Sequence, residues 1–148
     1  MDIKLAIGSD HAGFALKEAV RHYLDAKNMA YKDYGAYSEQ SVDYPEIGLA
    51  VSNAVKKGEA THGLLICGSG IGMSIVANKV TGVRAALCYE PELVVMSRQH
   101  NNANILVLAG RYTSPEKANK MVELFISTTF EGGRHQRRVD QIHTLTHR

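Results

Sequence analysis

The chain has 148 residues, of which 45% are apolar and 22% are charged, and its net charge is +2 at neutral pH. This length suits a single domain with a buried core, so we expect residues 1–148 to form one domain. No apolar run approaches the roughly 20 residues that a membrane-spanning helix needs, and the N-terminal residues do not follow the pattern of a signal peptide. Two cysteines are too few for a disulfide framework, and we expect a cytoplasmic protein.

Basic charge is concentrated at the C-terminal end of the chain. Residues 132–148 hold four of the 17 Lys and Arg residues but only one of the 15 acidic residues. A patch this small suits one or two phosphate groups, whereas nucleic-acid binders usually present a broader basic face. We therefore expect a phosphorylated small molecule as the ligand, and neither nucleic acid nor a membrane as a partner.

Apolar strand-like segments alternate with helical ones along the whole chain. Continuous apolar runs predict strands at 3–8, 29–34, 62–67, 84–89 and 105–109. Amphipathic spacing or start signals predict helices around 16–24, 45–57, 73–79, 90–98, 114–125 and 134–146. This alternation is typical of α/β proteins, so we expect a Rossmann-like, doubly wound, five-stranded parallel sheet with helices on both faces. A strand order of 2-1-3-4-5 would place the turns after the first and third strands side by side.

The third predicted strand ends in an unusual turn. Cys67 is its last residue, and Gly68, Gly70 and Gly72 follow at alternate positions. Glycine has no Cβ and lets another molecule approach the backbone, and the N–H groups of such a turn form a cradle for an anion or an oxyanion. These amides favour a reactive thiolate at Cys67, although a free cysteine is more often a small buried apolar residue. We keep that structural interpretation for Cys88, which lies inside an apolar run.

Three other interpretations of the glycine-rich turn fit less well. A Walker A loop would need Lys and Ser or Thr after its glycines, and here Met73 and Ser74 follow Gly72. A cysteine phosphatase loop would carry an arginine where Met73 stands. A dinucleotide fingerprint usually belongs to the first strand and has a different glycine spacing.

Further candidate residues follow other strands. Ligands of doubly wound sheets bind at the carboxyl ends of the strands, so Asp10 and His11, which follow the first strand, are expected to share a crevice with Cys67. The alternative for Asp10 is a helix N-cap. His100 lies in a loop that we place on the same edge, where the alternative is a solvated histidine.

The last predicted helix carries Arg134 and Arg138 four residues apart, and therefore on one face. We expect this pair to bind a phosphate group, and the helix could reach a neighbouring subunit. The alternative is a solvated basic face. No ligand set with zinc-type spacing stands out, and we expect neither a metal ion nor another cofactor. A thiol base, an oxyanion cradle, histidines and a phosphate cluster suggest a metal-free proton shuttle on a phosphorylated sugar.

Five motifs together resemble the ribose-5-phosphate isomerase B family, which also includes galactose-6-phosphate and allose-6-phosphate isomerases. They are G-S-D-H-A-G at 8–13, D-Y-P at 43–45, C-G-S-G-I-G-M-S-I-V-A-N-K at 67–79, S-R-Q-H-N-N-A-N at 97–104 and E-G-G-R-H-Q-R-R at 131–138. The resemblance runs through essentially the whole chain. One branch of the family has a glutamate base where this chain has Met73, so the resemblance is to the branch with a thiol base.

The resemblance implies an aldose–ketose isomerase that interconverts D-ribose 5-phosphate and D-ribulose 5-phosphate through a cis-enediolate, as in the pentose phosphate pathway. Cys67 would be the base, Ser69 would assist proton transfer between the sugar oxygens, and Asp10 and His100 would open the sugar ring. The residues that the resemblance implies for substrate binding are His11, Tyr44, Gly68, Gly70, Ile71, Gly72, Asn101, Arg111, Arg134 and Arg138. The last two would come from the partner subunit of a homodimer or homotetramer.

Two alternatives remain open on the sequence alone. The first is an isomerase of a hexose 6-phosphate such as allose 6-phosphate or galactose 6-phosphate. The second is a sugar-phosphate-binding module without turnover. Cys67, Asp10 and His100 argue against the second alternative, because binding alone does not require a thiol.

Overall fold

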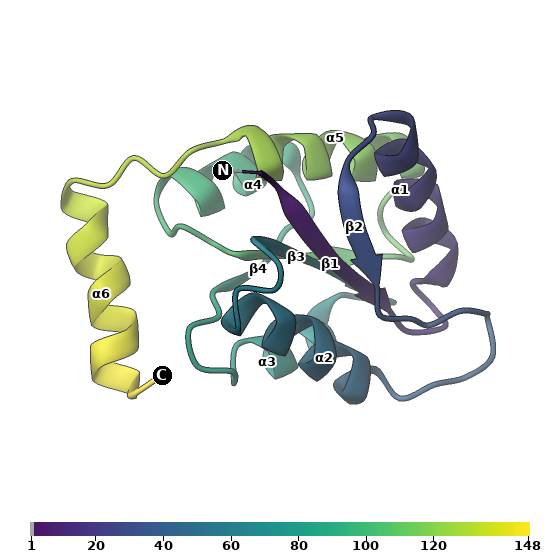
Figure 1. Ribbon diagram of the computed structural model, residues 1–148, viewed down its shortest axis with the longest axis horizontal. Coiled ribbons are helices and arrows are strands. Elements are labelled where there is room, and N and C mark those ends of the chain that lie inside the picture. The colour runs from purple at the N-terminus through teal and green to yellow at the C-terminus, as the bar shows by residue number, and fades with distance from the viewer. Residues whose placement is uncertain (1) are drawn as a thin grey trace.

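The computed structural model describes residues 2–148, in which a five-stranded parallel sheet lies between two layers of helices (Figure 1). The strands are β1 (Lys4–Ser9), β2 (Ala30–Asp33), β3 (His62–Cys67), β4 (Ala85–Leu87) and β5 (Ile105–Ala109). The helices are α1 (Phe14–Ala26), α2 (Tyr44–Lys56), α3 (Ile71–Ala77), α4 (Pro91–Gln99), α5 (Pro115–Ser127) and α6 (Arg134–Thr146). The predicted fold class is confirmed.

The strand order is β2-β1-β3-β5-β4. The predicted neighbours β1 and β3 do pair, but the expected order of the last two strands is wrong. Strand β5 is buried at all five positions, whereas the three residues of β4 are only half-buried. A longer, fully apolar strand is stabilised at the centre of a sheet, and a short, half-buried strand suits its edge.

Side chains alternate between the two faces of the sheet, as extended strands require. Ile7 and Ile66 belong to the core that α1, α4 and α5 cover. Leu65 and Cys67 belong to the core that α2 and α3 cover on the opposite face. Figure 1 shows these helix layers on the two sides of the sheet. The Cys67 side chain therefore faces the side of α2 and α3.

Helix starts agree with their sequence signals. The Ser114 hydroxyl caps α5 by accepting from the Lys117 N–H at 3.2 Å, and proline lies in the first turn of α2, α4 and α5. The longest helices have 13 residues. In the part of the chain that the structure describes, no helix is long and apolar enough to cross a membrane.

Helix α6 does not cover the sheet. It stands at the side of the molecule, at the end of a long connection from α5 (Figure 1). The Arg84 guanidinium lies 2.8 Å from Nε2 of His143 on α6, and the Gly82 N–H donates to the carbonyl of Arg148 at 2.7 Å. Arg134 and Arg138 remain exposed.

Candidate active site

A cleft of about 560 Å³ opens at the carboxyl edge of the sheet, where the turns after β1, β3 and β5 meet the first turns of α2 and α3. The predicted residues that line it are Asp10, His11, Tyr44, Cys67, Gly68, Ser69, Ile71, Gly72 and Arg111. The expected shared crevice of Asp10, His11 and Cys67 is thus confirmed. It arises because β1 and β3 are neighbours and parallel, so their carboxyl ends lie together.

A different neighbour leaves little room for a side chain at each of the three glycines after Cys67. Gly70 has φ +79, and a Cβ there would overlap the side chain of Leu87. A Cβ on Gly72 would lie 2.6 Å from the Tyr44 ring, and one on Gly68 would lie 3.2 Å from a guanidinium nitrogen of Arg111. Real Cβ atoms do not tolerate the first two contacts, so a side chain at either position would displace the contacting side chain or the turn itself. The glycines therefore allow close packing around the turn and leave its backbone accessible from the cleft.

Ser69 is held from both sides within this turn. Its hydroxyl oxygen accepts a hydrogen bond from the Ile71 N–H at 3.2 Å, and its carbonyl accepts one from the Tyr89 hydroxyl at 2.9 Å. Because the Ser69 hydroxyl acts as the acceptor in this bond, its own proton is available to a ligand in the cleft.

The two cysteines differ in environment although both are buried free thiols. Cys67 is the last residue of β3 and lines the cleft. Cys88 packs with the apolar core beneath α1, α4 and α5, and burial raises the pKa of its thiol to about 11 despite a hydrogen bond with Ser97. Cys88 therefore stays protonated at neutral pH, as its structural interpretation predicted.

Asp10 is buried at the bottom of the turn after β1. Its Oδ1 accepts from the Gly13 N–H at 2.9 Å, and its backbone N–H donates to the Ile66 carbonyl at 3.2 Å. The carboxylate thus stabilises the entrance to α1 and also lines the cleft. The N-cap residue of α1 is Gly13 and not Asp10. The alternative for Asp10 is therefore wrong about the N-cap position, although its carboxylate does accept a hydrogen bond from a backbone N–H at the start of the helix.

The tautomer of His11 follows from its neighbour in the loop. Its Nδ1 accepts a hydrogen bond from the Val42 backbone N–H at 3.2 Å. A backbone N–H can only donate, so in the neutral ring the proton resides on Nε2. His11 therefore offers one N–H donor, which suits an anionic oxygen.

A buried ion pair anchors the loop that leads to α2. The Lys17 side chain is fully buried, and its Nζ lies 2.7 Å from Oδ1 of Asp33 and also donates to the Ala36 carbonyl. The Ser9 N–H donates to the Gly35 carbonyl at 2.7 Å. These contacts fix this loop beside the turn after β1, which lines the cleft. Lys17 was not among the predicted residues, although a lysine among the apolar positions of α1 is a signal for a buried partner.

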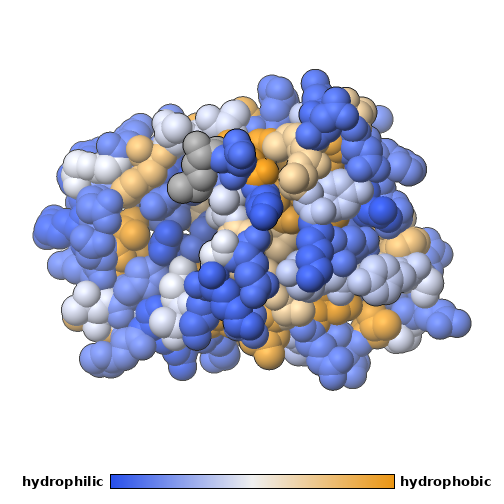
Figure 2. All heavy atoms as spheres, viewed as in Figure 1, coloured by the Kyte–Doolittle hydropathy of each residue, from blue (hydrophilic) through white to orange (hydrophobic). Residues whose placement is uncertain are grey.

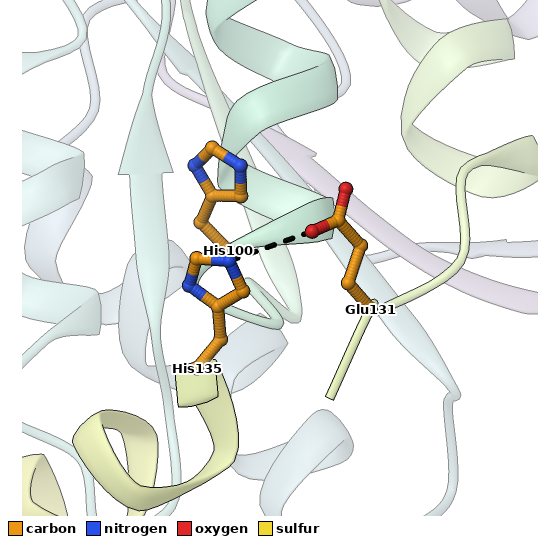
Figure 3. Close-up of side chains that lie close together, drawn as sticks. All are labelled: His100, Glu131 and His135. Atoms are coloured by element: carbon orange, nitrogen blue, oxygen red, sulfur yellow. Dashed lines mark ion pairs between the residues drawn. The ribbon is translucent and has the colours of Figure 1, made fainter. Parts of the chain in front are cut away.

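The remaining predicted residues do not lie in this cleft. His100 is the C-cap of α4 and precedes β5, so it lies at the amino edge of the sheet, opposite Cys67. The expectation that its loop shares the edge of Cys67 is wrong within one chain, because α4 runs back against the strand direction. The solvated alternative is also wrong, because the half-buried His100 ring stacks on His135 with centroids 4.4 Å apart (Figure 3).

Asn101, Arg134 and Arg138 also lie away from Cys67. Asn101 lines a second cavity, of about 350 Å³, together with Arg84 and residues of α6. The two arginines are exposed on α6. The predicted site residues thus form two sets at opposite edges of one sheet.

A cluster of metal-ligating groups at the amino edge was not foreseen. Ligating atoms of His100, Glu131 and His135 all lie within 4.8 Å of one another. Glu131 and His135 are four residues apart, a ligand spacing that was not among the predictions. His143 and His147 have the same spacing, but α6 ends at Thr146 between them, and His143 bonds to Arg84 instead.

Comparison with known proteins gives a consistent result over nearly the whole chain. Residues 5–142 match the family model described as ribose/galactose isomerase. The chain is 41% identical to ribose-5-phosphate isomerase B of Escherichia coli, covering 98% of this chain and 97% of that protein. It is also 36% identical to D-erythrulose-4-phosphate isomerase of Pectobacterium atrosepticum, covering 98% and 96% of the two chains.

Solved structures agree with this result. A ribose 5-phosphate isomerase from Thermotoga maritima superposes with a TM-score of 0.94 at 51% identity, covering 96% of this chain and 98% of that one. Ribose-5-phosphate isomerase B from Mycoplasma genitalium, solved with bound ribulose 5-phosphate, superposes with a TM-score of 0.93 at 40% identity. That comparison covers 99% of this chain and 98% of the other.

Proposed function

The chain belongs to the ribose/galactose isomerase family, and we propose that it interconverts D-ribose 5-phosphate and D-ribulose 5-phosphate with Cys67 as the base. The observation that carries this proposal is the position of Cys67, which ends β3 in a cleft lined by Asp10, His11 and a glycine turn. Both cysteines are free thiols, which suits the reducing cytoplasm where we propose that the enzyme works.

The Cys67 thiolate takes the proton from C2 of the aldose, which is weakly acidic because C1 is a carbonyl. The resulting cis-enediolate is stabilised by backbone N–H groups between Gly68 and Gly72, where the loss of one oxyanion donor would cost about 3 kcal/mol. The thiol then returns the proton to C1, while the Ser69 hydroxyl passes a proton from the C2 oxygen to the C1 oxygen. Both hydrogens stay within the sugar, so the reaction needs no external oxidant or cofactor.

The phosphate group is held by donors that face the cleft. His11 supplies its Nε2–H, as its bond from Val42 dictates. Arg111 lies against Gly68 and lines the same cleft, so its guanidinium is placed to bind the phosphate in a bidentate manner. Tyr44 packs over Gly72 and forms a wall of the cleft.

A second copy of the chain completes each site. His100, Asn101, Arg134 and Arg138 lie at the opposite edge of the sheet from Cys67, so they can act there only on another subunit's substrate. Large apolar side chains are exposed along α2 and α3 beside the cleft, among them Leu49 at 47% and Ile75 at 56%. Figure 2 shows apolar residues at the surface where these helices lie. Such a surface favours association, so we propose a homodimer or a larger assembly of dimers.

Within that assembly, His100 of one subunit and Asp10 of the other open the furanose ring. The Asp10 carboxylate is held at the cleft by the Gly13 N–H. The imidazole of His100 exchanges a proton with the ring oxygen, because an imidazole nitrogen can both donate and accept a proton. Arg134 and Arg138 add positive charge to the phosphate from the same subunit that supplies His100.

A four-carbon sugar phosphate is the second candidate substrate. The D-erythrulose-4-phosphate isomerase shares 36% identity with this chain over almost its full length, close to the 41% of the ribose-5-phosphate isomerase B. Family membership therefore does not fix the carbon number of the substrate. Hexose 6-phosphates remain the alternative that the wider family suggests.

Turnover on a panel of sugar phosphates tests these proposals. The panel contains ribose 5-phosphate, erythrulose 4-phosphate, allose 6-phosphate and galactose 6-phosphate, and kcat/KM is compared for each. We expect the highest value with ribose 5-phosphate. A higher value with another sugar would reassign the substrate, and binding without any turnover would identify a non-catalytic module.

A further inference from the structure

We propose that His100, Glu131 and His135 bind a divalent transition-metal ion of the zinc type, and that the bound ion inhibits the enzyme by occupying His100. The three residues lie at the amino edge of the sheet, where α4 ends and α6 begins, on the opposite side from Cys67 of the same chain. The proposed metal is an inhibitor and takes no part in the isomerisation. The inhibitory effect rests on the proposed function, whereas the binding site does not.

The geometry of the cluster is already close to that of a metal site. Oε2 of Glu131 lies 3.4 Å from Nε2 of His135. Two ligands of a tetrahedral zinc ion, each about 2.0–2.1 Å from the metal, are about 3.3 Å apart. Figure 3 shows the Glu131 carboxylate turned toward the paired imidazole rings. The His100 ring is stacked nearly parallel to that of His135, at an angle of 13°, so one of the two rings must turn before nitrogens of both point to the same ion.

The backbone holds these ligands before any ion arrives. The Glu131 N–H donates to the carbonyl of Gln99 at 3.1 Å, which ties the segment before α6 to the residue next to His100. The His135 N–H donates to the Gly132 carbonyl at 3.0 Å. The His135 side chain is only 9% exposed, whereas that of Glu131 is 50% exposed. The site is therefore fixed on its inner side and open to solvent on its outer side, which gives an ion a path of entry.

The donor set indicates which ions bind. Two imidazole nitrogens and one carboxylate oxygen are the ligands of many three-residue zinc sites, with water in the fourth position. Nitrogen donors also suit Co²⁺, Ni²⁺ and Cu²⁺. Mg²⁺ prefers six oxygen ligands and serves as the negative control.

A bound ion would stop the reaction through His100. The imidazole nitrogen that coordinates the metal can no longer accept or donate a proton, and coordination fixes the ring in place. His100 would then be unable to open the sugar ring in the neighbouring subunit's cleft. Zinc could also inhibit by binding the Cys67 thiolate, so the experiment must separate the two sites.

Calorimetric titration of Zn²⁺ into the Cys67→Ala variant isolates the proposed site, because the cleft thiol is absent. We expect one ion per chain, no binding of Mg²⁺, and a Co²⁺ complex without a sulfur charge-transfer band. Adding His135→Ala should weaken Zn²⁺ binding by at least about tenfold, since even the loss of an outer-shell partner costs about 10- to 100-fold. His22→Ala, which removes an exposed histidine of α1, should leave the affinity unchanged.

A second pair of variants guards against misfolding at the buried His135. Glu131→Ala alters an exposed side chain and should also weaken Zn²⁺ binding by at least about tenfold, whereas Glu116→Ala on α5 should not. Absence of saturable Zn²⁺ binding in Cys67→Ala would overturn the site. So would Zn²⁺ binding that survives both His135→Ala and Glu131→Ala.

Inhibition is measured separately, with each rate compared with that of the same variant without zinc. We expect the native chain to lose turnover of ribose 5-phosphate as the site fills, and Glu131→Ala to need at least about tenfold more Zn²⁺ for half-inhibition. Equal sensitivity of the two proteins would assign inhibition to Cys67 and overturn the regulatory part. If the native chain turned over no sugar phosphate, the proposed function would fail while the titration still decided the metal site.

Discussion

The two edges of the sheet are built in different ways. At the carboxyl edge, Asp10, His11 and Cys67 follow directly from strand ends, and backbone hydrogen bonds fix them in one cleft. At the amino edge, His100 and the arginines are carried by the end of α4 and by α6, and much of that surface is exposed. In the proposed function, the base and the oxyanion cradle are thus held by the sheet, while ring opening and part of phosphate binding depend on elements at its periphery.

The distance between the edges explains why the proposed site needs residues of a second chain. Strands β3 and β5 have six and five residues, and a strand rises about 3.3 Å per residue, so the edges are separated by roughly 15 Å or more. No histidine side chain spans that distance. The same separation lets a second copy place its amino edge over the first copy's cleft, which is why the two residue sets suit a symmetric pair.

Substitution of Cys67 should have the largest effect on catalysis. A positioned base accelerates a reaction by about 10²- to 10⁴-fold. We therefore expect Cys67→Ala to lower kcat by at least about 100-fold while substrate still binds. Cys88→Ala is the matched control, because it removes a thiol that burial keeps protonated. It should leave kcat near the native value. Turnover and calorimetric binding are measured on both variants, and near-native turnover of Cys67→Ala would refute the base assignment.

Mixing two inactive variants tests whether the edges of different subunits meet. Cys67→Ala and His100→Ala should each have little activity alone. After unfolding and refolding together, a mixed dimer contains one site with both native residues, and random pairing should restore about a quarter of the native rate.

Two controls accompany the mixing experiment. Each variant refolded alone should remain inactive, and mixing Cys67→Ala with Cys67→Ser should restore nothing. Failure to recover activity, in a mixture shown to contain mixed dimers, would mean that Cys67 and His100 do not act on the same substrate.

Gly70 and Gly82 separate the cost of backbone conformation from that of crowding. Both have positive φ, at +79 and +82, but only at Gly70 would a Cβ overlap a neighbour. We expect Gly82→Ala to lower the free energy of unfolding by about 1 kcal/mol without changing kcat. Gly70→Ala should cost about 1–3 kcal/mol more and lower kcat, because Leu87 or the glycine turn beside it must move. Urea denaturation and kcat measure both effects, and equal losses would show that the turn has room for a side chain.

The features predicted correctly from the sequence depend mainly on local structure. Strands β3 and β5 and helix α6 begin and end at the predicted residues, because apolar runs and Gly, Pro and Ser signals act within a few residues. The grouping of Asp10, His11 and Cys67 needed only the rule that parallel strands end at a common edge.

The features that were missed depend on packing between distant segments. The position of His100 follows from the direction of α4, and the edge position of β4 follows from competition between strands for the centre of the sheet. The pairing of Lys17 with Asp33 and the meeting of His100 with His135 join residues far apart in the chain. No periodicity encodes such contacts, since they depend on the complete fold.

His62 is a structural histidine at the amino edge, and we expect its effect only on the pH dependence of stability and not on kcat. Burial, with a further contribution from the Arg98 charge, lowers the pKa of His62 from 6.5 to about 4, and the ring packs edge-on against Phe125. Below pH 6.5 the unfolded chain binds a proton at this position that the folded chain does not bind until about pH 4. The stabilisation is therefore present above pH 6.5 and is lost as the pH falls toward 4.

Substitution of His62 separates this loss of stability from the effects of other groups that take up protons in acid. Because the ring is partly exposed, we expect His62 to account for about 1–2 kcal/mol of the stability lost between about pH 7.5 and pH 4.5, less than the full shift would give. In urea denaturation, His62→Gln should lose that much less stability over this interval than the native chain. His22→Gln, which changes an exposed histidine, should follow the native chain. An identical pH dependence for native and His62→Gln proteins would show that His62 is protonated as easily in the folded chain as in the unfolded one.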